Sequence, residues 1–144
     1  MSVLKRILYA EDSAADVELT LAALEEHHLA NEVVAVGDGV EALDYLYRRG
    51  AFASREAGNP AVVLLDLKMP RVDGLEVLRQ VKSDPDLRTI PVVIMTSSRE
   101  ERDLVESYRL GVNAYVVKPV DFEQFVAAVK EVGMFWAVVN EPPP

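Results

Sequence analysis

The chain has 144 residues, half of them apolar, no cysteine, and a formal net charge of −9. This length suits one domain with one core, and the lack of cysteine excludes disulfides and thiolate metal sites, which suits the cytoplasm. Without a basic stripe to neutralise phosphates, we expect no nucleic-acid partner. No apolar run reaches the ~18 residues of a membrane span, and the N-terminus lacks the apolar region of a signal peptide, so we expect no membrane contact.

Short apolar runs alternate with helical patterns along the chain. The runs cover residues 7–10, 31–36, 61–65, 91–95 and 114–117, and the second is the most polar, as expected of an edge strand. Continuous apolar runs of this length are typical of buried strands in a parallel sheet. With a helix after each strand and right-handed crossovers, the sequence predicts an α/β domain of (βα)5 type with helices on both faces of the sheet.

Three helices are predicted in the first two thirds of the chain. Ser13 can cap the first, with Asp16 three residues later. The second ends toward Gly50, and the third stops before Pro85, because the residue preceding a proline avoids the helical conformation. The segment Arg48 to Pro60 is longer than the usual connection of about 2–6 residues, and its plainer interpretation is a mobile, solvated loop.

Two more helices are predicted in the last third. Ser98 and Glu101 form a capping box for the fourth helix, which ends at Gly111. Its apolar positions are Leu104, Val105 and Tyr108. The fifth extends from residue 122 to about residue 139.

Polar residues directly follow four of the five apolar runs. The first run is followed by Glu11 and Asp12, the third by Asp66, the fourth by Thr96 and Ser97, and the fifth by Lys118. Because the carboxyl ends of parallel strands meet at one edge of a sheet, we expect three carboxylates, hydroxyl groups and an ammonium group to converge there.

Such a group of side chains has a definite chemistry. Clustered carboxylates raise one another's pKa unless a cation neutralises them, and hard oxygen ligands suit Mg²⁺, which takes one or two carboxylates together with a phosphate. A carboxylate can also be the nucleophile that forms an aspartyl phosphate, a transfer that needs charge stabilisation more than acid or base groups. Lys118 would supply charge and Thr96 or Ser97 a hydroxyl donor.

Each residue also has a plainer interpretation. Glu11 and Asp12 can favour the N-terminus of the following helix through its dipole, Asp66 can begin a turn, and Tyr115 is of a kind common in cores. We prefer a shared site because four strand ends carry complementary groups at the same edge of the predicted sheet.

Four segments, in this order and spacing, make the chain similar to the receiver domains of two-component response regulators along nearly its whole length. They are Glu11-Asp12, Leu64-Leu65-Asp66-Leu67-Lys68-Met69-Pro70-Arg71-Val72-Asp73-Gly74, Met95-Thr96-Ser97 and Tyr115-Val116-Val117-Lys118-Pro119. The resemblance implies the flavodoxin-like fold, with a five-stranded parallel sheet in the order 2-1-3-4-5.

The resemblance also implies a set of metal ligands. Asp66 would be the phosphoacceptor, and Asp12 and Asp66 would bind Mg²⁺ directly. Glu11 would act through a water molecule, and the backbone carbonyl of Lys68 would complete the ligands from the protein.

Further roles follow from the same resemblance. Thr96, with Ser97 beside it, and Lys118 would hold the phosphoryl group. Tyr115 would be an aromatic switch that changes rotamer, and the peptide bond before Pro119 would be cis.

Three features resemble a subgroup of the family, the single-domain regulators that partner bacterial phytochromes. They are the long connection after the second helix, the segment Ser83-Asp84-Pro85-Asp86-Leu87 ahead of Ile90-Pro91, and Phe135-Trp136 near the end of the chain. This likeness implies a sensor histidine kinase of the phytochrome type as partner.

We therefore expect one receiver domain over residues 1–144, with a core at about 4–133, an extension at 134–144, and no output domain. It would take a phosphoryl group from a sensor histidine kinase and signal through a conformational switch or a phosphorelay. It would catalyse its own phosphorylation and dephosphorylation without being an enzyme that acts on a separate substrate.

A receiver-fold scaffold that works without phosphate is the alternative, although it has no need of the full set of site residues. A phosphatase with an Asp nucleophile would need a second carboxylate where Lys68 stands.

The end of the chain predicts a homodimer. Residues 134–139 are all apolar, more than one face of a terminal helix buries in its own domain. We expect Phe135, Trp136 and Val139 to form the contact, since large exposed aromatic side chains are enriched at interfaces. Alternatively, Trp136 folds back over the core of its own subunit.

Overall fold

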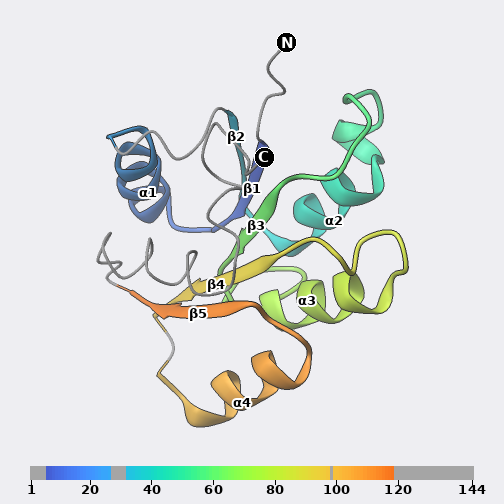
Figure 1. Ribbon diagram of the computed structural model, residues 1–144. Coiled ribbons are helices and arrows are strands. Elements are labelled where there is room, and N and C mark those ends of the chain that lie inside the picture. Colours follow the sequence, from blue (N-terminus) through green and yellow to red (C-terminus); the bar gives the residue numbers. More distant parts are fainter. Residues whose placement is uncertain (1–5, 27–31, 98, 119–144) are drawn as a thin grey trace, which may run out of the picture.

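The computed structural model describes residues 6–26, 32–97 and 99–118, which build a five-stranded parallel sheet (Figure 1). The strand order is β2-β1-β3-β4-β5, which confirms the predicted fold. The strands are β1 (Arg6–Ala10), β2 (Glu32–Val36), β3 (Val62–Leu65), β4 (Val92–Thr96) and β5 (Ala114–Val117).

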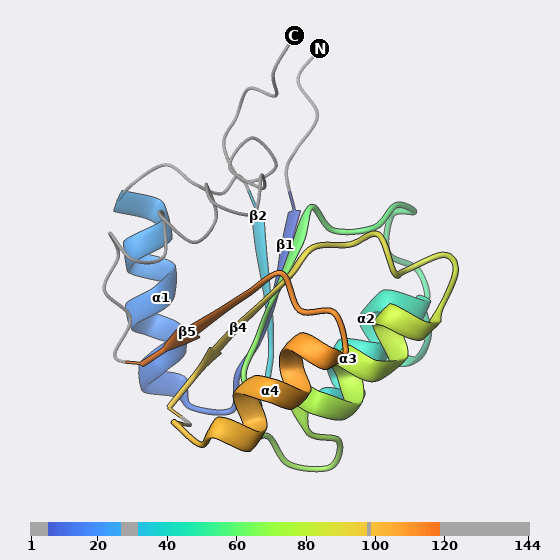
Figure 2. The same ribbon diagram turned by 60° about the horizontal axis from the view of Figure 1, so that its bottom comes forward.

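Helices cover both faces of this sheet. They are α1 (Ala14–Glu26), α2 (Gly39–Tyr47), α3 (Gly74–Ser83) and α4 (Glu101–Arg109), with a 3-10 turn η1 (Gly50–Phe52) after α2. Figure 2 shows α1 on one face and α2, α3 and α4 on the other. The predicted fifth helix lies outside the described residues, and within them no helix has the length and apolar character needed to cross a bilayer.

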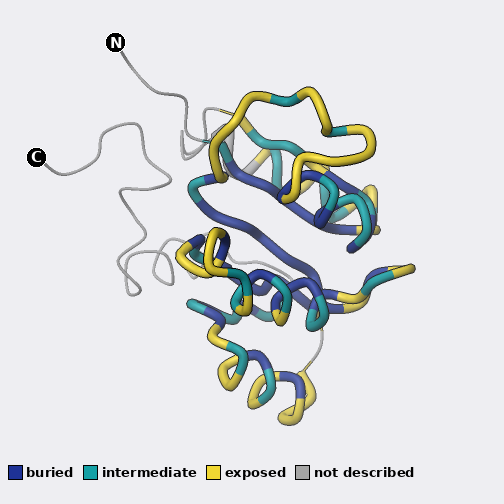
Figure 3. Tube along the Cα trace, turned by 90° about the vertical axis from the view of Figure 1, so that its right-hand side faces the viewer, coloured by how far each residue is buried: buried dark blue, intermediate teal, exposed yellow. Residues whose placement is uncertain are grey.

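The central strands form the core. Every residue of β3 and β4 is buried, which explains why both appear in the sequence as unbroken apolar runs rather than as alternating patterns. The edge strand β2 exposes Glu32 and Ala35. Figure 3 shows the buried residues gathered in the middle of the domain and the exposed ones on its outer turns and loops.

Carboxylates and a hydroxyl begin three of the helices. The Ser13 hydroxyl accepts a hydrogen bond from the Asp16 N–H (3.3 Å), as predicted. Asp38 caps α2 and Asp73 caps α3 in the same way. The predicted capping box at α4 is wrong, because Glu100, with an extended backbone, takes the cap position without a side-chain bond. Ser98 itself lies outside the described residues.

The end of α2 also differs from the prediction. Arg48, rather than Gly50, adopts the left-handed conformation that ends the helix (φ 55°). The next N–H group, that of Arg49, closes the last turn on the Asp44 carbonyl (2.9 Å). Gly50 is also left-handed (φ 58°) and starts η1, so two successive turns, rather than one, redirect the chain.

The long connection after α2 is exposed at most positions, as predicted, but it is bound to the domain. Arg55 Nε donates to the Tyr45 carbonyl (2.7 Å), and its guanidinium lies 4.1 Å above the Tyr45 ring. Phe52 packs edge-on against the same ring. From β1, Arg6 donates to the carbonyls of residues 57 and 58. Arginine–carbonyl bonds thus replace the mobility expected of this segment.

The helix α4 buries polar residues rather than its apolar ones. Its buried residues are Asp103 and Ser107, and the Ser107 hydroxyl donates to the Asp103 carbonyl (2.7 Å). The apolar positions that marked this helix in the sequence are exposed: Leu104, Val105 and Tyr108. The periodicity located the helix but not its buried face.

The chain passes so close to itself at Gly74 that a side chain there has no room. A β carbon on Gly74 would lie 2.2 Å from the Asp66 carbonyl oxygen, and its backbone conformation is one that alanine accepts. We therefore expect Gly74→Ala to lower the free energy of unfolding by about 2 kcal/mol through overpacking alone. Denaturant unfolding measures the change.

Gly37→Ala is the matched control, because a β carbon there meets only the Glu41 side chain, at 3.4 Å. Its effect should stay within about 0.5 kcal/mol. Equal losses in the two variants would show that the close approach at Gly74 does not limit stability.

Candidate functional site

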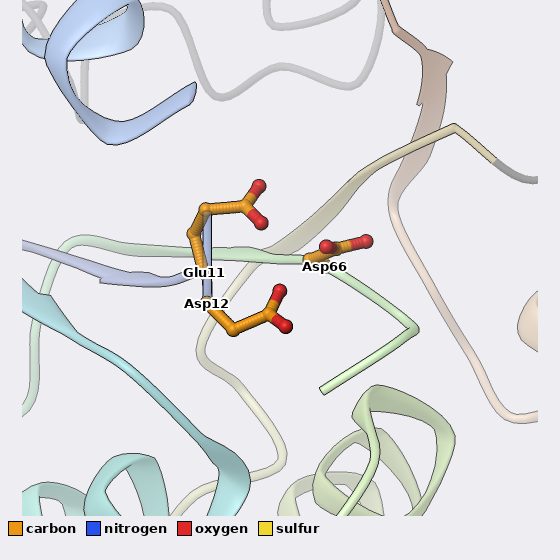
Figure 4. Close-up of side chains that lie close together, drawn as sticks. All are labelled: Glu11, Asp12 and Asp66. Carbon is orange, nitrogen blue, oxygen red and sulfur yellow. The ribbon is translucent and has the colours of Figure 1, made fainter. Parts of the chain in front are cut away.

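Three carboxylates meet at the carboxyl edge of the sheet. Ala10 at the end of β1 lies opposite Leu65 at the end of β3, and the Asp66 N–H donates to the Ala10 carbonyl (3.0 Å). This register places Glu11 and Asp12 beside Asp66, with one oxygen of each within 4.8 Å of the others. Figure 4 shows the three side chains gathered at these two strand ends. The predicted convergence is therefore present.

The three carboxylates differ in exposure. Glu11 and Asp66 are buried, whereas Asp12 is exposed. Burial, followed by the neighbouring Asp66 carboxylate, raises the pKa of Glu11 to about 7, against the opposing effect of Lys118. Like charges held this close destabilise one another, so the site favours a cation.

Lys118 provides a positive charge within the cluster. Its N–H donates to the Thr96 carbonyl (2.8 Å), and its ammonium group pairs with Glu11. Asp16 Oδ2 lies 2.9 Å from Nζ and Asp66 Oδ2 lies 3.5 Å from it. Burial alone would lower the pKa of Lys118, but the carboxylates of Glu11 and Asp16 raise it overall, so the side chain stays charged.

The predicted hydroxyl and aromatic residues lie on the neighbouring strands. Thr96 ends β4 and is fully buried, and Ser97 follows it, exposed to solvent. Tyr115 in β5 is half-buried and packs against the hydrophobic core. Their roles in holding phosphate and in switching stay predictions. Pro119 and the predicted dimer residues Phe135, Trp136 and Val139 lie outside the described residues.

Sequence reasoning missed two residues that support the site. The Tyr9 hydroxyl lies 3.4 Å from Glu11 Oε1 and 3.2 Å from Thr20 Oγ1, and burial raises the pKa of Tyr9 to about 12. Tyr9 belongs to an apolar run, so nothing in the sequence separates it from the core. Asp16 was noticed only near a helix start, although its place one turn after Glu11 and Asp12 could have indicated a role at the site.

Lys68, two positions after Asp66, has an exposed side chain. The Lys68 ammonium lies 3.5 Å from Asp103 Oδ2, and the Asp103 side chain is almost completely buried. The Lys68 N–H is 3.5 Å from Asp66 Oδ1. Its backbone carbonyl as a metal ligand stays a prediction, and the link to α4 through Asp103 was not predicted.

The donor set fits a hard divalent cation. Its side-chain ligand atoms are carboxylate oxygens, with neither sulfur nor imidazole among them, and such a set suits Mg²⁺, Mn²⁺ or Ca²⁺ rather than a soft metal. A nucleophilic carboxylate beside such a cation and an ammonium group is equipped to accept a phosphoryl group.

The sequence of residues 7–130 matches the family model of the response regulator receiver domain. The chain belongs to this family. The match runs from β1 through the last described strand and includes all the residues that converge at the edge of the sheet.

Relatives within the family include phytochrome response regulators. Response regulator Rcp1 of Synechocystis sp. is 37% identical over 132 residues, which covers 92% of this chain and 88% of Rcp1. The solved bacteriophytochrome response regulator RtBRR is 65% identical, with a TM-score of 0.86, and the match covers 99% of this chain and 86% of that one.

Two relatives were solved with a metal ion bound or with a phosphoryl group attached. Rcp1 was solved in an Mn²⁺-bound form, at 36% identity and a TM-score of 0.78, and the match covers 97% of this chain and 99% of that one. The cyanobacterial phytochrome response regulator RcpA was solved phosphorylated, at 42% identity and a TM-score of 0.78, with coverage of 93% and 94%. Receiver domains thus bind divalent metal, and the acidic cluster of this chain has the donors for it.

Repulsion among the three carboxylates should lower the stability of the metal-free protein. Asp12 makes no ion pair with any described residue. Asp12→Asn should therefore raise the free energy of unfolding in EDTA by about 1 kcal/mol, the scale of a like-charge interaction near 4 Å in water. Denaturant unfolding measures the change.

Glu18→Gln removes one negative charge from the exposed side of α1 and controls for the net charge of the chain. It should change the free energy of unfolding by less than about 0.5 kcal/mol. If Asp12→Asn is no more stable than wild type in EDTA, the carboxylates do not repel in the folded state.

Proposed function

We propose that this chain is a stand-alone response regulator that accepts a phosphoryl group on Asp66 from the phosphohistidine of a sensor kinase. The observation that carries the proposal is the place of Asp66 at the end of β3, beside Glu11 and Asp12 and within 3.5 Å of the Lys118 ammonium. In this proposal residues 1–144 form a single receiver domain that includes the C-terminal extension.

The transfer needs little from the protein beyond position and charge. An oxygen of Asp66 forms the new bond to phosphorus while the phosphorus–nitrogen bond of the phosphohistidine breaks, and its electron pair stays on the imidazole. Lys118, already near Asp66, offsets charge on the phosphoryl oxygens. The hydroxyl of Thr96 or Ser97 donates a hydrogen bond to the same oxygens.

Mg²⁺ is the cation proposed for the acidic cluster. Asp12 and Asp66 would bind it directly, Glu11 through water, and Lys68 through its carbonyl. When bound, the cation supplies charge neutralisation for the incoming phosphoryl group. We expect the phosphoryl donor to approach from the side of Asp12, which is exposed.

The bound phosphoryl group would change the equilibrium between two conformations. Drawing the Thr96 hydroxyl toward it leaves space in which Tyr115 can turn inward, and the surface around α4 follows. The signal then passes to another protein through contact, or the phosphoryl group is passed on. The chain thus catalyses its own phosphorylation and dephosphorylation.

The kinase is proposed to be phytochrome-like and the location cytoplasmic. The support is the similarity to Rcp1, RcpA and RtBRR, which are described as a response regulator, a phytochrome response regulator and a bacteriophytochrome response regulator. A scaffold that works without phosphate is the alternative. The pairing of Lys118 with buried acids favours the phosphoryl site, because a scaffold has no use for this costly arrangement.

Phosphorylation by a small acyl phosphate tests the proposal. Intact-mass measurement after treatment with acetyl phosphate and MgCl2 should show one added phosphoryl group on the wild-type chain. The addition should vanish in Asp66→Asn and in wild type with EDTA, because the first lacks the nucleophile and the second lacks the cation.

Asp73→Asn is the matched control, since Asn keeps the helix cap that Asp73 provides for α3. This variant should be phosphorylated like wild type. Phosphorylation of Asp66→Asn to the wild-type extent would contradict the proposal.

A homodimer through the C-terminal extension is proposed as well, and it rests on the sequence of residues 134–139. A two-fold contact uses the same patch on both subunits, so loss of Phe135, Trp136 and Val139 would affect the contact twice. Analytical ultracentrifugation should find dimers of the full chain at micromolar concentration and monomers after truncation behind Gly133. Truncation behind Asn140, which removes only Glu-Pro-Pro-Pro, should stay dimeric. A monomeric full chain refutes the dimer.

A further inference from the structure

The loop between β3 and α3 is joined to the start of α2 by an ion pair. Arg71 Nε and Nη2 each lie 2.8 Å from Asp38 Oδ2. Arg71 has a left-handed backbone (φ 66°), which is uncommon for a residue with a β carbon. The loop therefore holds an unfavourable backbone conformation at the residue whose side chain reaches α2.

Asp38 is fixed by α2 before it meets Arg71. Its Oδ1 accepts a hydrogen bond from the Glu41 N–H (2.9 Å), which caps the helix, and Oδ2 is left for the guanidinium. Burial alone would raise the pKa of Asp38, but the bonds from Glu41 and Arg71 lower it overall. The loop is thus tied to an ionised carboxylate whose position the helix determines.

Backbone contacts seat the same loop. A β carbon on Gly39 would lie 2.0 Å from the Val72 carbonyl oxygen, so the first residue of α2 touches the loop directly. At the other end of the loop, the Gly74 N–H donates to the Leu67 carbonyl (2.9 Å). Between these two fixed points the chain passes through Lys68.

We propose that Asp38 is a positioning residue for the metal site, because by holding Arg71 it keeps Lys68 in place, with its N–H 3.5 Å from Asp66 Oδ1, so that its carbonyl can bind the cation. This inference rests on the metal ligands of the proposed function. Ordering a loop costs conformational entropy, so a loop ordered before the cation arrives binds it more tightly. Partners that orient ligands raise metal affinity in this way.

Loss of Arg71 would change the affinity for Mg²⁺ in opposite directions, depending on whether its charge or its positioning of the loop matters more. Removing a positive charge from the loop beside the acidic cluster would strengthen Mg²⁺ binding, whereas releasing the loop would weaken it. Asn tolerates the left-handed conformation, so Arg71→Asn removes the guanidinium without adding backbone strain. The sign of the change in Kd therefore separates the two effects.

Isothermal titration of the full chain with MgCl2 measures that Kd. Arg71→Asn should raise it about tenfold, the lower end of the effect seen for groups that orient metal ligands. Asp38→Ser, which keeps a capping side chain on α2 but is too short to reach Arg71, should have a similar effect. The double variant should bind no more weakly than either single variant, because both break one interaction.

Two further variants sharpen the test. Arg71→Lys keeps a charged donor and should give an intermediate Kd. Arg79→Ala is the matched control, since it removes the cation of an exposed pair with Glu76 on α3 that does not touch the loop. Its Kd should stay within about twofold of wild type, as exposed ion pairs contribute little.

The outcomes distinguish this inference from the function on which it rests. Wild type that binds no Mg²⁺ would refute the proposed metal site. Wild type that binds, with an unchanged or lower Kd in Arg71→Asn, overturns the positioning role alone, and so does a double variant whose losses add. Circular dichroism establishes that each variant is folded, and Arg71→Asn decides the question if Asp38→Ser does not fold.

Discussion

The ammonium group of Lys118 makes the acidic edge of the sheet compatible with folding. It pairs with Glu11, Asp16 and Asp66, and burying two of these carboxylates without a cation would cost several kcal/mol. The group reaches them because its backbone N–H bonds to the end of β4. The pairing of β5 with β4 therefore also places the positive charge that the buried carboxylates need. A single ammonium still leaves the cluster with excess negative charge, so the folded chain keeps a donor set that suits a divalent cation.

The sequence predicted the sheet and its acidic edge because both depend on local patterns. Unbroken apolar runs mark β3 and β4, whose residues are all buried. In a parallel sheet the carboxyl ends of the strands lie at one edge, so the convergence of the polar residues could be predicted without knowing any side-chain contact. The predictions at α4 and at the end of α2 failed where partners distant in the chain decide the outcome. The buried face of α4 carries Asp103, which pairs with Lys68 from another loop, and no periodicity contains that information.

The supporting residues of the site were harder to predict than the charged residues at the strand ends. Asp66 and Lys118 end apolar runs and are conspicuous, whereas Tyr9 has the same pattern as its core neighbours and contributes only a hydroxyl beneath Glu11. Asp38 and Arg71 lie 33 positions apart in the chain, and each alone suits a turn or a helix cap. Their pairing follows from the close approach of α2 to the loop, which only the folded chain reveals.

The polar buried face of α4 has a thermodynamic consequence. Most helices gain their attachment to a domain from apolar side chains removed from water, yet α4 buries Asp103 and Ser107 and leaves Val105 and Tyr108 more than half exposed. Among the described residues, little of its attachment to the domain therefore comes from buried apolar side chains, and Asp103 contributes an ion pair with Lys68. An element held in this way belongs to the least stable part of a fold, and a change of about 1–2 kcal/mol in one contact alters the ratio of its attached and displaced states by roughly five- to thirtyfold.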